Sequence, residues 1–100
     1  MAGNSEFAAV YDLGLKDFSA LDGPQRLQFD SFVGQKLNLW EFTFYGHERG
    51  LIADDAWGAW DGHFKSQIIL ESWRFVWTTG KRDSYQGPVQ DYVDAYLADN

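Results

Sequence analysis

The fold of this chain is decided by residues 24–49, which read PQRLQFDSFVGQKLNLWEFTFYGHER. On a helical wheel the large apolar side chains of this stretch fall within an arc of roughly 160°. They are Phe29, Phe32, Val33, Leu37, Leu39, Trp40 and Phe44. Asp22 is a suitable N-cap, Pro24 fits a first turn, and Gly50 can adopt the left-handed conformation that closes a helix. The stretch therefore predicts one long amphipathic helix, whose wide apolar arc needs neighbours on more than one side.

Shorter amphipathic stretches flank the long helix on both sides. Residues from about 5 to 14 predict a helix, because apolar side chains recur there at spacings of three and four. After Gly50, Asp54 is placed to cap a helix with Trp57, Trp60, Phe64 and Ile68 on one face, and a further stripe holds Ile69, Trp73, Val76 and Trp77. Gly87-Pro88 then opens the last helix, with Val89, Tyr92, Val93, Tyr96 and Leu97 on its apolar face.

The connection at residues 66–72, SQIILES, is ambiguous. It can continue the helix, or Ser66 can end one helix and cap the next. We favour a break, because the apolar stripe changes phase after Ile68. No sustained alternation of apolar and polar residues predicts a strand. The sequence thus predicts an all-α fold, a small bundle of four to five helices around the helix at about 24–49.

Composition bounds the class of protein. The chain has 100 residues, 18% of them aromatic, which is enough for a single domain over residues 1–100 with one core. Residues 1–5 are expected to be disordered or an artificial start. The net charge of −7 makes nucleic acid and anionic membranes poor partners. The chain has no cysteine for disulfides or thiolate chemistry, and its short apolar runs predict no membrane insertion.

The two histidines are the side chains best suited to catalysis or metal binding. His47 and His63 could meet across a helix pair, with Glu41 or Asp61 as oxygen ligands. Glu41 and His47 are six residues apart, however, which does not place them on one helix face. His47 is better explained as a histidine near a helix C-terminus, where the dipole favours its cation. We therefore expect no metal, cofactor or catalytic residue, and a protein that is not an enzyme.

The tryptophans are the most unusual feature of the composition. Together with a tyrosine and an arginine at the mouth, they could line an apolar ligand pocket or a partner surface. The candidate residues are Trp40, Trp57, Trp60, Trp73, Trp77, Tyr45 and Arg74. The simpler interpretation, favoured by their helical spacing, is that the tryptophans fill the core.

The chain also resembles a group of small uncharacterised bacterial proteins, in which an N-terminal membrane helix precedes a soluble helical region. The matching residues are Phe29, Tyr45, Gly50-Leu51-Ile52, Trp57, Trp60, Trp73, Tyr85 and Tyr92-Val93-Asp94. The chain lacks the membrane helix of that group and a Pro-Gly near Ile68-Ile69. The resemblance implies an architecture and a soluble segment tethered to a bacterial inner membrane in the full-length protein. It implies no activity.

Two functions are consistent with these observations. The first is a non-enzymatic protein-interaction or structural module that binds a protein partner or a second copy of itself. The alternative is a small-molecule-binding domain with an apolar pocket lined by tryptophan.

Overall fold

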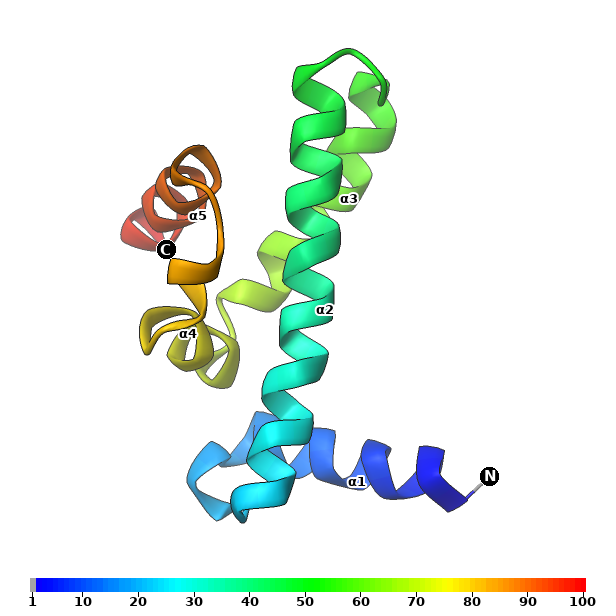
Figure 1. Ribbon diagram of the computed structural model, residues 1–100, viewed down its shortest axis with the longest axis vertical. Helices are drawn as coiled ribbons and strands as arrows, with labels where there is room; N and C mark the ends of the chain where they lie inside the picture. Colours follow the sequence, from blue (N-terminus) through cyan, green and yellow to red (C-terminus); the bar gives the residue numbers. More distant parts are fainter. Residues whose placement is uncertain (1) are drawn as a thin grey trace.

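The computed structural model describes residues 2–100 and has an all-α architecture, as predicted (Figure 1). No strand occurs within these residues. Two short 3-10 turns, η1 and η2, lie between the α-helices. The elements are α1 Ala2–Lys16, η1 Phe18–Ala20, α2 Gly23–Glu48, α3 Asp54–Ile68, α4 Glu71–Thr78, η2 Lys81–Ser84 and α5 Gly87–Asp99.

The long helix α2 forms the axis of the molecule, which confirms the central prediction. Its first turn is closed by a capping box: Asp22 Oδ1 accepts from the backbone N–H of Gln25 at 2.8 Å, and Gln25 Oε1 accepts from the N–H of Asp22 at 3.0 Å. Gly50 has a φ of +74° just beyond the C-cap Arg49, as its position suggested. Figure 1 shows α1 crossing the N-terminal end of α2, α3 returning beside its C-terminal half, and α4 and α5 on one side.

The core lies between α2 and the helices around it. Side chains from η1 to α5 contribute to it, and α1 adds partly buried Val10, Tyr11 and Leu15 at its edge. Leu39, which the sequence placed in the apolar arc, lies at the margin of that arc and is exposed. The buried apolar residues are Leu21, Phe29, Val33, Leu37, Trp40, Phe64, Ile68, Trp73, Val76, Trp77, Tyr85, Val89 and Val93.

The first helix is longer than the predicted range of 5 to 14. Residues 2–5 belong to α1, and Met1 lies outside the described residues. Gly14 does not end the helix; it lets α1 approach α2, because a Cβ at Gly14 would lie 2.5 Å from Cδ2 of Phe29. The Ser72 hydroxyl of α4 also donates to the carbonyl of Gly14. A glycine needed for close packing was therefore mistaken for a helix end.

The predicted break within 66–72 is present, but it falls at Ile69–Leu70. Ser66 stays inside α3, where its Oγ donates to the carbonyl of His63 at 2.6 Å. The predicted cap Asp54 is wrong by one residue, because the N-cap of α3 is Ala53, which makes no side-chain cap bond.

Candidate interaction surface along α2

Three of the candidate tryptophans, Trp40, Trp73 and Trp77, are buried in the core. Each indole N–H donates a hydrogen bond of 2.8 to 3.0 Å to a polar side chain on another helix: Trp40 to Asp61, Trp73 to Tyr11 and Trp77 to Asp94. A buried indole usually needs such a partner, and these three have one. They hold helices together and do not face a ligand or a partner.

The other candidate residues have different surroundings. Trp57 is partly buried and stacks on the His47 ring, with 5.2 Å between centroids and an interplanar angle of 11°. Trp60 is 45% exposed on α3. Tyr45 lines a groove on α2, and Arg74 is partly buried on α4; the Tyr45 hydroxyl and Arg74 Nε have no hydrogen-bond partner within the described residues. The structure therefore does not unite the seven residues in one site.

A buried carboxylate joins three helices near Trp40. Asp61 Oδ1 accepts a hydrogen bond from the Trp40 indole at 3.0 Å. Asp61 Oδ2 accepts one from the Tyr92 hydroxyl at 2.7 Å and lies 2.8 Å from Lys65 Nζ. Burial raises the pKa of Tyr92, which keeps the phenol protonated and able to donate. Asp61 is thus satisfied by its neighbours, and its arrangement is that of a structural junction and not of a general base.

The two histidines lie in different surroundings. His47 Nε2 is 2.8 Å from Oδ1 of Asp54, so the end of α2 is tied to the start of α3. His63 is exposed on α3 and contacts the Phe64 ring. Among the residues that the structure describes, no group of three or more His, Asp and Glu side chains is placed to hold a metal ion. No described helix is long and apolar enough to cross a bilayer.

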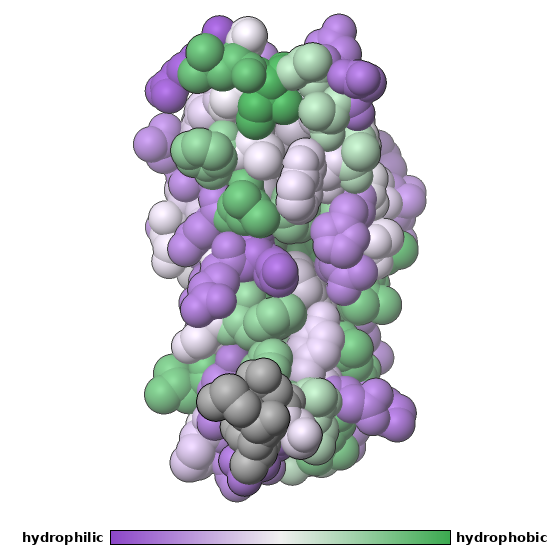
Figure 2. Space-filling view, turned by 90° about the vertical axis from the view of Figure 1, so that its right-hand side faces the viewer, coloured by the Kyte–Doolittle hydropathy of each residue, from purple (hydrophilic) through white to green (hydrophobic). Residues whose placement is uncertain are grey.

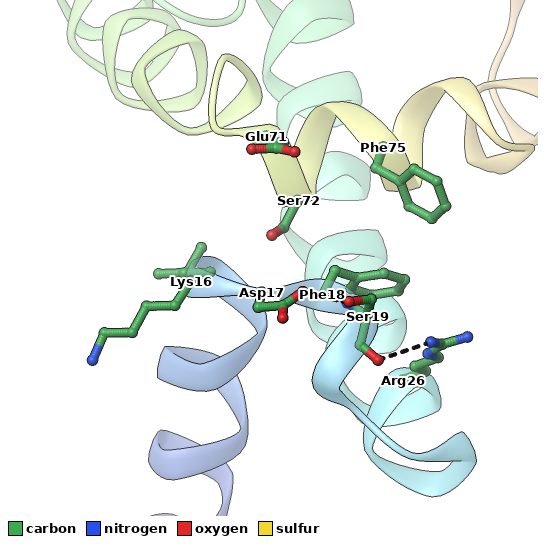
Figure 3. A pocket seen from close by; sticks show the side chains of 9 residues that line it. Lys16, Asp17, Phe18, Ser19, Arg26, Glu71, Ser72 and Phe75 are labelled. Carbon is green, nitrogen blue, oxygen red and sulfur yellow. Dashed lines mark hydrogen bonds between the residues drawn. The ribbon is translucent and has the colours of Figure 1, made fainter.

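A cavity of about 320 Å³ lies where α1, η1 and α4 meet (Figure 3). The Phe18 and Phe75 rings line one side of it, and Lys16 extends away from the other side chains. Arg26 donates to the Ser19 carbonyl at 3.3 Å and to another carbonyl at 3.1 Å. Ser72 and Asp17 are likewise hydrogen-bonded within the protein, so much of the polar lining of the cavity already has partners.

A strip on α2, exposed except at the half-buried Tyr45, is the stronger candidate. We call it the α2 outer strip; its members are spaced by three or four residues and therefore share one helix face. Leu27 is 67% exposed and Phe42 is 71% exposed, although both are large and apolar. None of its members is charged, in a chain in which 23% of residues are. The strip comprises Leu27, Ser31, Gln35, Asn38, Phe42 and Tyr45.

Each end of the α2 outer strip is hollowed. Near the N-terminal end a groove of about 460 Å³ is bounded by Leu27 on α2 and by the Phe7 and Phe32 rings. Near the C-terminal end a groove of about 590 Å³ is bounded by Phe42, Tyr45 and Ile52, with the charged Glu41 and Arg49 at its margin. A large side chain therefore stands beside a groove at both ends.

Exposed apolar residues also gather where α2 turns into α3. Leu51 in that turn is 79% exposed. Figure 2 shows one side of the molecule, on which green, hydrophobic residues collect at this end and are interrupted by purple, hydrophilic ones further along. Scattered exposed apolar residues are ordinary, so the continuity and the lack of charge are what single out the α2 outer strip.

Sequence reasoning missed this strip. The predicted apolar arc of the helix does not include Leu27 and Phe42. On the wheel both lie roughly opposite the centre of the arc, where a solvent-facing helix usually carries charged or polar residues. That position was a readable signal.

No known protein family matches the chain, and no curated protein or solved structure is significantly similar to it. The resemblance to small bacterial proteins with a membrane helix therefore stays a prediction, and the geometry alone must carry a functional proposal.

Proposed function

We propose that this domain is a non-enzymatic protein-interaction module and that the α2 outer strip is its contact surface. The observation that carries the proposal is the combination of Leu27 and Phe42, both more than two-thirds exposed, on one uncharged face of the longest helix. Interfaces are depleted of charge at their centre and enriched in aromatic residues, which is the composition of this strip.

Burial against a partner would make this strip energetically useful. Removing a Leu or Phe side chain from water is worth about 1.5–3 kcal/mol, so two such anchors supply a meaningful part of a binding free energy. The grooves beside Leu27 and Phe42 would receive side chains of the partner. The anchors and the grooves together fit a protein surface better than they fit solvent.

The shape of the strip favours a protein over a small molecule. From Leu27 to Tyr45 it extends about 27 Å along the helix, at a rise of 1.5 Å per residue. A small ligand is normally enclosed on most of its surface in a concave site. The pocket lined by tryptophan that the sequence suggested is less favoured, because three of the indoles are buried and hydrogen-bonded within the core. If the bacterial resemblance holds, the module would act beside the membrane that anchors the full-length protein.

Photo-crosslinking in cells that express the protein tests this proposal. A photoreactive phenylalanine analogue is placed at Phe42, and in a matched control at Phe75, an exposed phenylalanine on α4. We expect a discrete protein adduct from position 42 and none from position 75. Absence of an adduct at position 42, or equal adducts at both positions, would contradict a contact surface on α2.

A further inference from the structure

We propose that the occupant of the α2 outer strip is a second copy of this chain, bound through its own strip in the antiparallel direction. This inference rests on the proposed function and names the partner of the same surface.

The α2 outer strip has a similar order of residue types in both directions. Large apolar residues stand at Leu27 and Phe42, short polar residues at Ser31 and Asn38, and Gln35 in the middle. A twofold interface pairs each residue with its counterpart in reversed order on the other protomer. An axis beside Gln35 places Leu27 opposite the partner's Phe42 and Ser31 opposite the partner's Asn38. The part of the strip from Leu27 to Phe42 therefore pairs with itself, and Tyr45 lies beyond the paired part.

The two grooves suit this register. Leu27 borders the N-terminal groove, which Phe7 and Phe32 also line. Phe42 borders the C-terminal groove, which Ile52 also lines. When Leu27 and Phe42 face each other across a twofold axis, each large side chain lies over the groove at the opposite end of the other protomer. Both anchors then lose solvent exposure in the same geometry.

Charge is compatible with a second copy at this face. Two molecules of net charge −7 repel each other, so they can associate only through a face on which like charges do not meet. The α2 outer strip is such a face. The acidic residues beside it are engaged elsewhere: Asp30 pairs with Lys81 Nζ at 2.6 Å, and Glu41 accepts from the N–H of Gln86 at 3.2 Å.

The polar middle of the strip specifies direction and limits affinity. The amides of Gln35 and Asn38 carry both donors and acceptors, so they can pair with the same groups of an identical chain. Buried polar residues of this kind fix register between helices and cost stability. A face about 27 Å long and about 10 Å wide is small, since stable interfaces bury about 1,200–2,000 Å² in total. The expected dimer is therefore weak and forms as concentration rises.

Cysteine substitutions test the register directly, because the chain has no cysteine of its own. Under mild oxidation Gln35→Cys, nearest the axis, is expected to give a covalent dimer. Ser31→Cys alone is expected to give almost none, since two copies of that position lie about 10 Å apart along the axis and a disulfide spans a Cα separation of about 4.4–6.8 Å. Mixing Ser31→Cys with Asn38→Cys restores the covalent dimer. Efficient self-linking of Ser31→Cys alone would overturn the antiparallel arrangement.

Light scattering across a concentration series tests the dimer without any cysteine. The wild-type mass is expected to rise toward twice that of the chain, and Phe42→Glu is expected to abolish the rise. Phe75→Glu adds the same charge at another exposed phenylalanine and should leave the rise unchanged. Circular dichroism verifies that both variants remain helical.

The possible failures are distinguishable. A protein that stays monomeric, yet forms an adduct of a different mass through position 42, would overturn self-association and leave the interaction surface in place. A monomer without any adduct at position 42 would overturn both proposals.

Discussion

The two faces of α2 both carry large apolar side chains, but only one of these faces is buried. On the inner face Phe29, Val33 and Leu37 are buried, and each contacts side chains from other helices. On the outer face Leu27 and Phe42 remain mostly in water. Apolar area stabilises a fold only when it leaves water. The comparison teaches that the inner face explains the stability of the domain, and that the outer face needs a different explanation.

The largest change in the free energy of unfolding is expected from a substitution on the inner face. Phe29→Ala removes a fully buried ring that packs against Tyr11 and Phe18 of the N-terminal segment. It should lower the free energy of unfolding by about 3–5 kcal/mol, through lost burial and the cavity left behind. Urea unfolding followed by circular dichroism measures this loss. A loss below about 1 kcal/mol would mean that the inner face is not the core of the domain.

The next largest change in the free energy of unfolding is expected at Gly14, which contacts the same ring. Gly14→Ala forces a methyl group against Phe29 and should cost about 1–3 kcal/mol by overpacking. Gly58→Ala on α3 is the matched control: its Cβ would meet open space, so it should gain up to about 1 kcal/mol from helix propensity. In the Phe29→Ala background most of the cost of Gly14→Ala should disappear, leaving only the tight fit against Leu21 Cδ1, 3.0 Å from the added Cβ. Additive costs would contradict direct contact between the two positions.

A smaller change in the free energy of unfolding is expected at the border between the two faces. There the Tyr85 hydroxyl donates to the Gly34 carbonyl of α2 at 3.2 Å. Burial, and then the charges of Glu41 and Asp30, raise the pKa of Tyr85 to about 12. Tyr85→Phe should cost about 1 kcal/mol at pH 7.

The sign of its pH dependence follows from that raised pKa. The Tyr85 contribution is complete below about pH 10, the ordinary tyrosine pKa, and is lost as the pH rises toward 12, because the unfolded state releases its proton first. Unfolding free energies of wild type and Tyr85→Phe should therefore converge by about pH 11 and cross above it, because a shift of about two pKa units outweighs a difference of about 1 kcal/mol. A difference that stays constant over this range would contradict the raised pKa.

The smallest change in the free energy of unfolding is expected from a substitution on the outer face. Phe42→Ala should change the free energy of unfolding by no more than about 0.5 kcal/mol when measured at a protein concentration that keeps the chain monomeric. A loss of 2 kcal/mol or more would show that Phe42 belongs to the core, and the contrast between the faces would fail.

Much of the fold follows from the sequence because helix periodicity and capping are local. The capping box at Asp22 and the left-handed Gly50 are readable from residue types alone. Gly14 was misread because a glycine at a close helix approach and a glycine at a helix end look alike until the partner ring is known. Asp54 was misread because its carboxylate bonds His47, which only the tertiary structure brings near.

Less of the candidate site was predictable. The tryptophans drew attention by their number, yet their burial depends on how five helices meet. The α2 outer strip was visible on the helical wheel, but its exposure was not, because a neighbouring helix might have covered Phe42. The grooves beside the strip are lined in part by side chains of α1 and of the turn after α2. No local sequence pattern predicts that these side chains lie next to the strip.

The three buried indoles provide separate spectroscopic reporters of this structure. Trp40 bonds α2 to α3, Trp73 bonds α4 to α1, and Trp77 bonds α4 to α5. Each indole proton gives its own NMR resonance, and its exchange with deuterium requires one particular helix junction to open. Comparing the three exchange rates would show in what order the domain comes apart below its global unfolding.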